Sequence, residues 1–487
     1  MTKQKAAKAG LWSALDIAFR QGVQFVVTIV LARLLTPEDF GVIALLAFFA
    51  TLSIAFAQSG LTAGLVQRQD TSRAEESAVF WWNLAVALIF SVVMVAAGPA
   101  LAAFYEIPVL RPLMWVAAAQ VILSALGAVH SALMTRSLEF GQLTKVGVAS
   151  SVVAGVAGVA IAVMGGGIWA LAAQMTAAAA VNTAGLWMVS PWRPSLHWRF
   201  RTIRRILNFG TWVSIGYLLE VLYTQGSSLL IGKLYGVRDL GFYNRAMSTQ
   251  LLPSSIMAQI VSRIALPLFA ARAEDLDALR RGLRMAIGLA MMLNLPLMTG
   301  LALLAPEVLV VLFGAKWLPA APILTILAIG GILFPLHAIN LQLVLAQGHT
   351  RIFLRNEIAK KTIGVTCMLV GSVFGIVGLA YSQIVYSLLA AIVNTRPSQV
   401  SLGYGLIRQL RDLTGIFLAT AVMAAGVLAL KILLDMEPLP TLVICTAAGG
   451  LLYLLTGFLI RSASFMDALS LLPVPGFRRP AAEREGT

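Results

Sequence analysis

Three polar residues recur at every fourth position in an otherwise apolar stretch near the N-terminus: Asp16, Arg20 and Gln24. At roughly 100° per residue, this spacing places the three side chains on one stripe of a helix. Asp16 and Arg20 can neutralise each other as a local ion pair. The aspartate can instead accept a proton in coupled transport, and the residues alone leave both roles open.

Three more ionisable residues fall in apolar segments: Glu220, Arg245 and Arg263. Each such charge costs about 2.5–3.5 kcal/mol to insert into a membrane, so we expect these side chains to face a bundle interior or a water-filled space. Tyr223 and Thr224 extend the polar face of Glu220, and Gln259 lies one turn before Arg263. Glu220 can also be a proton acceptor, and both arginines lie near enough to span ends to reach a headgroup region by snorkelling.

The elements that position these residues are membrane-spanning helices. The chain has 487 residues, of which 59% are hydrophobic and 12% charged, and its mean hydropathy is +0.86. Soluble proteins contain about twice that fraction of charge. The net charge of +15 is concentrated in loops on the side of the N-terminus. The positive-inside rule therefore explains it, predicts cytoplasmic N- and C-termini and leaves no reason to expect nucleic acid binding.

The apolar runs predict an all-α fold of about fourteen spans, which are 12–34, 40–64, 79–103, 112–134, 144–165, 167–189, 209–232, 243–269, 284–305, 320–346, 362–378, 379–395, 414–434 and 439–460. The boundary between the eleventh and twelfth spans is placed at Gly378. We expect an N-terminal lobe at 1–190, a basic amphipathic linker at 191–208, a C-terminal lobe at 209–400, two further spans within 401–460 and a cytoplasmic tail at 461–487.

The first helix and its turn recur 200 residues later, where Gly10, Trp12, Leu34, Asp39 and Gly41 match Gly210, Trp212, Leu234, Asp239 and Gly241. A second set matches at an offset of 208: Gly167, Ile168, Leu171 and Ala172 with Gly375, Ile376, Leu379 and Ala380. Six spans separate the repeats, so both have the same orientation and form two parallel lobes. Under the 200-residue offset Arg20 and Glu220 are equivalent, and we expect them to face a shared space.

No motif indicates catalysis, a metal or a cofactor. Cys367 and Cys445 fall in predicted spans, and the four histidines lack ligand spacing. The chain has no phosphate-binding loop, no nucleophile motif and only short outer loops, so we expect a protein that is not an enzyme. His337 and Asn340, three residues apart in one span, are expected to make packing hydrogen bonds.

Five segments carry a resemblance: Leu31–Leu45 (LARLLTPEDFGVIAL), Leu240–Met247 (LGFYNRAM), Leu266–Arg272 (LPLFAAR), Leu312–Ala328 (LFGAKWLPAAPILTILA) and Leu345–Arg351 (LAQGHTR). In this order they resemble the polysaccharide-transport, Wzx-like flippases of the multidrug/oligosaccharidyl-lipid/polysaccharide exporter superfamily. The two extra C-terminal spans are most similar to the branch associated with capsule, colanic-acid and exopolysaccharide export.

The resemblance implies two six-helix lobes around a central cavity that opens alternately to each side of the bacterial inner membrane. It implies transport of an undecaprenyl-pyrophosphate-linked oligosaccharide from the inner to the outer leaflet. Arg20 and Arg245 would then bind the pyrophosphate, with Arg263 near the cytoplasmic entrance. Gln24, Tyr223, Thr224 and Gln259 would bind sugar hydroxyls. The expected partners are this substrate, membrane lipids and the polysaccharide polymerase machinery, and the protein is expected to be a monomer.

Two other functions remain as alternatives. A multidrug or cation antiporter of the same superfamily should favour buried acids, whereas the predicted site has more arginines than acids. A membrane polysaccharide polymerase or ligase should carry catalytic residues on a long outer loop. The resemblance also disfavours a lipid II substrate, because lipid II flippases of the same superfamily carry further arginines in their first two helices, whereas the second span here, 40–64, has none.

Overall fold

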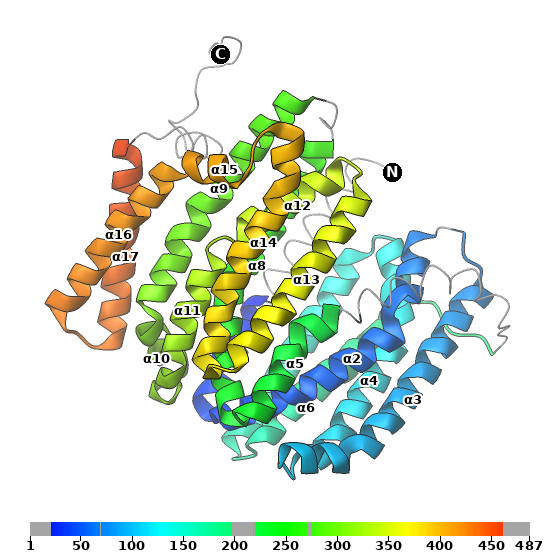
Figure 1. The fold of residues 1–487 in the computed structure, drawn as a ribbon. Helices are drawn as coiled ribbons and strands as arrows, with labels where there is room; N and C mark the ends of the chain where they lie inside the picture. The colour runs from blue at the N-terminus through cyan, green and yellow to red at the C-terminus, as the bar shows by residue number, and fades with distance from the viewer. Residues whose placement is uncertain (1–20, 69, 197–217, 219, 271–274, 461–487) are drawn as a thin grey trace. The chain divides into compact units, whose positions relative to one another are not determined.

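The protein is α-helical in the computed structural model, which describes residues 21–68, 70–196, 218, 220–270 and 275–460 (Figure 1). Within those ranges the backbone contains helices and turns but no strand. Nine segments of this described part are long and apolar enough to cross a membrane. The chain is therefore a multi-pass membrane protein, and the count of fourteen spans stays a prediction.

The first half forms a helix at Gln21–Leu34, α2 (Pro37–Gln67), α3 (Arg73–Tyr105), α4 (Leu110–Arg136), α5 (Phe140–Val163), α6 (Ile168–Val189), a helix at 220–234 and α8 (Val237–Ala270). Local signals set the helix starts. Thr36 and Asp39 form a capping box at α2, and Ser72 and Glu75 form another at α3. These side chains bind backbone N–H groups that the first turn leaves without a partner.

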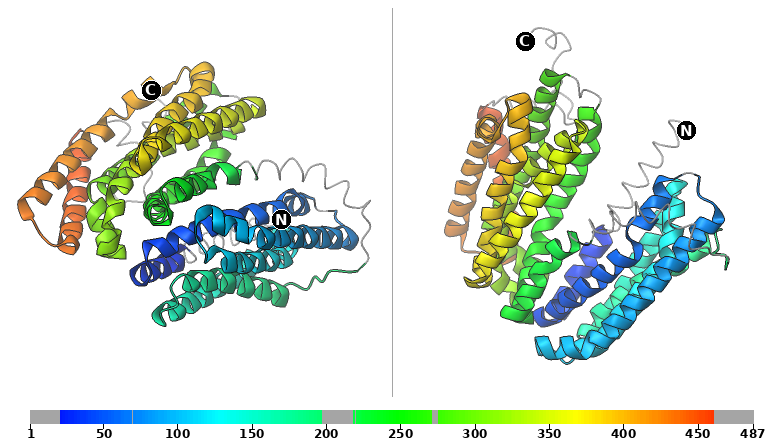
Figure 2. Two further views of the ribbon diagram at one scale, coloured as in Figure 1. Left: turned by 60° about the horizontal axis from the view of Figure 1, so that its bottom comes forward. Right: turned by 45° about the vertical axis from the view of Figure 1, so that its right-hand side comes forward.

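The second half forms α9 (Leu276–Leu303), α10 (Ala305–Phe313), the 3-10 helix η1 (Ala315–Ala320), α11 (Ala321–Gly331), α12 (Phe334–Ala346), α13 (Thr350–Ser372), α14 (Gly375–Leu402), α15 (Leu406–Asp412), α16 (Thr414–Leu434) and α17 (Pro438–Ile460). Helices that follow each other through short turns pack side by side, as α3 with α4, α5 with α6, α13 with α14 and α16 with α17 (Figures 1 and 2). The predicted last two spans agree closely with α16 and α17.

The predicted boundary at Gly378 is wrong. The helix α13 ends at Ser372, and α14 begins at Gly375, whose φ is +82°. Glycine adopts this left-handed conformation without steric strain, so the chain turns there. Its predicted equivalent, Gly167, also has a positive φ, +52°, and immediately precedes α6. The 208-residue offset therefore locates the turn better than hydropathy does.

By internal contacts the chain divides into two compact units, Met1–Asn244 (unit 1) and Arg245–Thr487 (unit 2). The division falls inside α8. The predicted division at the linker 191–208 stays a prediction, because the linker lies outside the described residues from position 197 onward.

The start of the predicted linker packs on unit 1. The indole N–H of Trp81 donates to the carbonyl of Ser195 at 2.9 Å, and the backbone N–H of Ser195 donates to Ser77 Oγ at 3.0 Å. Trp192 is buried against Phe80 and His130. These contacts hold the chain after α6 against the N-terminal part of α3.

The matched glycines of the two repeats meet in unit 1. A side-chain methyl at Gly41 would overlap the carbonyl oxygen of Val237, and one at Gly241 would overlap the carbonyl oxygen of Pro37. Both contact pairs are related by the 200-residue offset, so they exchange under a local twofold operation, as in an isologous interface. The N-terminal turns of α2 and α8 therefore cross at backbone contact, which only glycine permits.

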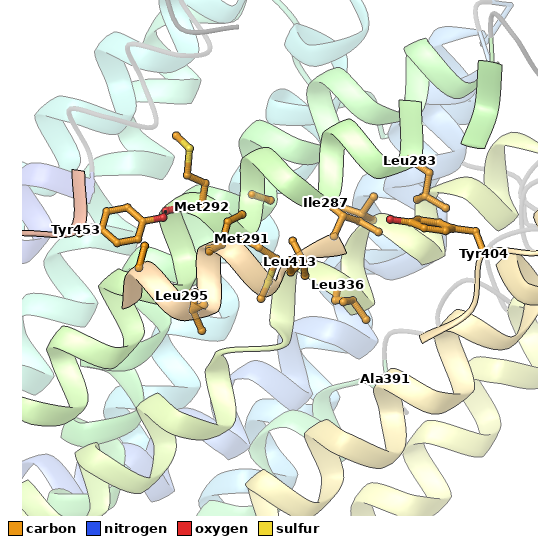
Figure 3. Packing of buried hydrophobic residues seen from close by; sticks show 14 of the residues in the cluster. Leu283, Ile287, Met291, Met292, Leu295, Leu336, Ala391, Tyr404, Leu413 and Tyr453 are labelled. Atoms are coloured by element: carbon orange, nitrogen blue, oxygen red, sulfur yellow. Dashed lines mark hydrogen bonds between the residues drawn. The ribbon is translucent and has the colours of Figure 1, made fainter. Parts of the chain in front are cut away.

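The core of unit 2 is a buried cluster organised along α9. Figure 3 shows Leu283, Ile287 and Leu295 of this helix within the cluster, with Tyr404 near one end and Tyr453 near the other. The Tyr453 hydroxyl donates to the carbonyl of Met292 at 2.7 Å, which fastens α17 to α9. A further tie joins α16 to α10, where Lys431 pairs with Glu307 at 2.7 Å.

We expect Gly41→Ala and Gly241→Ala to lower the melting temperature of the detergent-solubilised protein. An added methyl must push two backbones apart, and overpacking of this kind costs about 1–3 kcal/mol. Gly22→Ala and Gly226→Ala are matched controls in helices, because a methyl there meets no neighbouring atom within 4 Å. Thermal denaturation followed by size-exclusion chromatography measures the difference. Equal stability of all four variants would contradict the close crossing.

Candidate functional site

The polar stripe of the first helix is only partly within the described residues. Asp16 and Arg20 lie outside them, so their expected ion pair and the facing of Arg20 toward Glu220 stay predictions. Gln24 belongs to the helix Gln21–Leu34 and is exposed. The binding of sugar by Gln24 stays a prediction.

The equivalent helix of the second repeat, at 220–234, presents an exposed polar face. Glu220 and Thr224 are exposed and lie four residues apart, and Tyr223 beside them is half-buried. The Thr224 hydroxyl donates to the carbonyl of Glu220 at 2.8 Å. An exposed carboxylate on an apolar helix requires a polar space rather than lipid. The structure thus brings three of the expected site residues together on one face.

A close helix contact positions this polar face. Gly232 and Ile231, on the same helix, are buried. A methyl at Gly232 would lie 2.8 Å from a methyl of Leu45 in α2, so the glycine allows the two helices to approach closely. The helix ends at position 234, and the chain turns at Gly236, whose φ is +86°, immediately before α8 starts.

Sequence reasoning missed one charged pair at the crossing of the repeats. Arg238 Nε lies 3.1 Å from Glu38 Oε1, and both side chains are largely exposed. Their numbers differ by 200, and they lie beside the matched residues Asp39 and Asp239. The pair could have been predicted from the sequence, because Glu38 and Arg238 have opposite charges at equivalent positions near the matched residues Gly41 and Gly241. The same logic underlies the predicted pairing of Arg20 with Glu220, 18 residues earlier in each repeat.

Arg245 is buried within unit 2, with 6% of its surface exposed. Its guanidinium carbon lies 4.9 Å from the ring centre of Phe313 and 5.2 Å from that of Trp317. Under the 200-residue offset its counterpart is Leu45, which is fully buried. A guanidinium tolerates such a core position because its flat, weakly hydrated surface stacks on aromatic rings. Binding of pyrophosphate by Arg245 stays a prediction, and it requires the guanidinium to leave these rings.

The helix α8 runs without interruption through Gln259 and Arg263. The expectation that Arg245 and Arg263 lie on one continuous helix is therefore confirmed. The side chains of Gln259 and Arg263 lie outside the described residues, so their expected contacts with substrate stay predictions.

The packing role expected for His337 and Asn340 is confirmed. His337 Nε2 lies 3.3 Å from Ser387 Oγ. The Asn340 amide donates to Gln409 Oε1 at 3.0 Å. These bonds join α12 to α14 and α15.

Outside the spans, Tyr404 lies between α14 and α15 at one end of this arrangement. Its hydroxyl donates to Asp412 at 2.8 Å, and Asp412 also pairs with Arg284 of α9 at 3.0 Å. Burial, reinforced by the hydrogen bond to Asp412, raises the pKa of Tyr404 above its ordinary value. The phenol therefore remains a neutral donor and holds α14, α15 and α9 together.

Residues 30–322 match the family described as polysaccharide biosynthesis protein. The chain belongs to this family. The resemblance to polysaccharide flippases of the exporter superfamily, first based on five segments, is thereby confirmed.

Curated relatives support the same assignment. The chain is 28% identical over 325 residues to the succinoglycan biosynthesis transport protein ExoT of Rhizobium meliloti, a match that covers 66% of each chain. It is 23% identical over 406 residues to the lipopolysaccharide biosynthesis protein WzxC of Escherichia coli, covering 81% of this chain and 82% of that one. It is 26% identical over 406 residues to the teichuronic acid biosynthesis protein TuaB of Bacillus subtilis, covering 81% and 83%.

Solved structures share the fold. The lipid II flippase MurJ in an inward closed conformation aligns with a TM-score of 0.75 at 14% identity, covering 92% of this chain and 98% of that one. An inward-facing multidrug resistance transporter of the same superfamily aligns with a TM-score of 0.63 at 15% identity, covering 79% and 98%. At these identities the likeness shows the fold alone.

We expect Arg245→Ala to lower the thermal stability of the protein even without substrate. The variant loses two ring contacts, each worth about 0.5–2 kcal/mol, and leaves space inside unit 2. Arg281→Ala is the matched control, because Arg281 is an exposed arginine of the same unit. Melting curves of the purified variants give the comparison. If Arg245→Ala loses transport but melts like the parent, Arg245 acts through substrate contact rather than packing.

Proposed function

We propose that this protein flips an undecaprenyl-pyrophosphate-linked oligosaccharide across the bacterial inner membrane by alternating access, for the assembly of a surface polysaccharide. Family membership supports this function. The observation that carries it is the exposed polar face of Glu220, Tyr223 and Thr224 on an apolar helix. A lipid-soluble cargo with a polar head needs such a face at hydrocarbon depth, because lipid tails cannot solvate sugars or pyrophosphate.

In the proposed mechanism, the pyrophosphate and the oligosaccharide of the substrate bind to different residues. Arg20 binds the pyrophosphate through its planar set of donors, which matches phosphate geometry. Gln24 and Thr224 hydrogen-bond sugar hydroxyls. Glu220 pairs with Arg20 when the substrate is absent and thereby lowers the cost of keeping the cation in the membrane. Asp16 either shares this pairing or accepts a proton that couples transport.

The names of the relatives support a polysaccharide pathway without selecting one sugar. They refer to the biosynthesis of succinoglycan, lipopolysaccharide and teichuronic acid. We further propose that the protein acts as a monomer with both termini in the cytoplasm. It would deliver its cargo to a polysaccharide polymerase on the outer side of the membrane.

Deletion of the gene should cause lipid-linked oligosaccharides to accumulate in the inner leaflet while the mature polysaccharide disappears. Mass spectrometry of extracted lipids measures the accumulation, and an expressed wild-type copy should reverse it. Absence of any accumulated lipid-linked sugar, with polymer still exported, would rule out the proposed function.

Arg20→Ala should reduce polymer export at least about tenfold, because a charge-assisted contact is worth about 1.5–3 kcal/mol. The amount of protein in the membrane should stay unchanged. Arg20→Glu combined with Glu220→Arg should recover more export than either single change. Strictly additive losses would contradict the pairing of the two residues, and normal export by Arg20→Ala would remove Arg20 from the mechanism.

A further inference from the structure

The exposed apolar face of α14 ends in an arginine. Val385, Leu388 and Ile392 lie three or four residues apart on one face of this helix, and each is about half exposed. Apolar side chains that stay exposed on a membrane span face lipid tails, because contact with water would be unfavourable. Arg396 is exposed and lies one turn beyond Ile392 on the same face. It therefore lies on the lipid side of unit 2.

The length of α14 places Arg396 at the level of the lipid headgroups. The helix has 28 residues and is about 42 Å long, whereas the hydrocarbon core of a membrane is about 30 Å thick. At the turn before the helix, the exposed side chains of Val373 and Phe374 are apolar, so the hydrocarbon core reaches that turn. The excess length, about eight residues, therefore lies at the other end, which contains Arg396 and Val400.

The short helix α15 adds two arginines at the same membrane surface. It joins the ends of α14 and α16, which are both long and apolar enough to span the membrane (Figure 1). Arg408 and Arg411 of α15 are exposed and lie three residues apart. The guanidinium of Arg408 donates to the carbonyl of Gly403 at 2.5 Å, which holds this arginine beside the end of α14. The arginines of the two helices therefore gather at one end of unit 2.

Buried contacts fix the orientation of α15. Gln409 is fully buried, and its amide donates to the carbonyl of Tyr404 at 2.9 Å. Asp412 pairs with Arg284 of α9. The side of α15 that carries Gln409 therefore faces the unit, and the side that carries Ile407 faces outward.

Two large apolar side chains stay exposed among these arginines. Val400 is 84% exposed and Ile407 is 83% exposed. Such exposure to water is unfavourable, whereas a short helix lying in the membrane surface can insert apolar side chains between the upper parts of the acyl chains. The combination of exposed arginines and exposed apolar side chains matches a phospholipid, which offers a phosphate next to acyl chains.

The three arginines are not used to fold the chain. Within the part of the chain that the structure describes, Arg396, Arg408 and Arg411 form no ion pair with a carboxylate. In unit 1, by contrast, Arg193 donates to the carbonyls of Ser190, Trp192 and Trp187 at 2.6–2.8 Å, so that its guanidinium fixes the chain after α6.

We propose that Arg396, Arg408 and Arg411, together with Val400 and Ile407, bind anionic phospholipids of the surrounding bilayer. A guanidinium can donate two parallel hydrogen bonds to one phosphate. A zwitterionic headgroup also offers a phosphate, but its ammonium group repels the arginines. The ligand is bilayer lipid rather than transported cargo, because Arg396 continues the lipid-facing side of α14. The bound lipids hold the connection between α14 and α16 at the membrane surface. This inference does not depend on the proposed function.

The test uses the purified full-length protein in detergent micelles that contain equal amounts of phosphatidylglycerol and phosphatidylcholine. Native mass spectrometry counts the retained lipids, and the parent should retain mostly phosphatidylglycerol. Arg396→Gln, Arg408→Gln and Arg411→Gln should each lower this preference about fivefold, the factor expected for one basic residue at an anionic surface. Arg396→Lys should retain the preference, because it keeps the charge. Arg111→Gln, which removes an exposed arginine at the start of α4, is the control.

Ile407→Ser should weaken the retention of both lipids equally, because it removes an acyl-chain contact and no charge. If the triple variant Arg396→Gln/Arg408→Gln/Arg411→Gln keeps the same lipid preference as Arg111→Gln, the proposal is overturned. A lower melting temperature of the glutamine variants with an unchanged lipid preference would show a structural role alone and would also overturn it. Binding of inorganic pyrophosphate by the parent without any preference for phosphatidylglycerol would assign the arginines to the cargo instead of the bilayer.

Discussion

An ionised side chain at hydrocarbon depth needs a partner or a polar space, because lipid tails provide neither. The protein meets this constraint in three ways. Lys360 pairs with Glu357 on the inner side of α13. Arg245 stacks on two aromatic rings within unit 2. Glu220 stays exposed on a face that also carries a threonine and a tyrosine.

A second constraint is the backbone crossing of the two repeats. Gly41 and Gly241 allow the first turns of α2 and α8 to touch, and Glu38 pairs with Arg238 across the same point. Each of these contacts involves residues whose numbers are related by the 200-residue offset. The contacts at the crossing and the sequence match therefore show the same local twofold relation between the repeats. A substitution on one side disturbs both helices, because each glycine accommodates the backbone of the other repeat.

The two repeats share a scaffold but differ in charge. Leu45 fills a core position that Arg245 occupies in the second repeat. The helix α5 is apolar where α13 carries Glu357 and two lysines. Packing alone would keep equivalent positions alike, since the same helix contacts recur. The two repeats therefore keep the same helix packing while differing in the charged side chains that they carry.

The sequence by itself determined the membrane class, most span positions, the two repeat offsets and the family, because hydropathy and periodicity are properties of neighbouring residues. It also indicated the exposed polar face of Glu220 and Thr224, since residues four apart share a helix face. Only the tertiary structure decided that Arg245 is stacked in a core and that α13 extends through Lys360. The rings that contact Arg245 belong to Phe313 of α10 and Trp317 of η1, about 70 residues further along the chain. The charged turn of α13 lowers the local mean hydropathy, so hydropathy alone leaves that turn out of the predicted span. The position of a charged residue along the bundle depends on the register between its helix and the helix packed beside it. Hydropathy and periodicity do not determine that register.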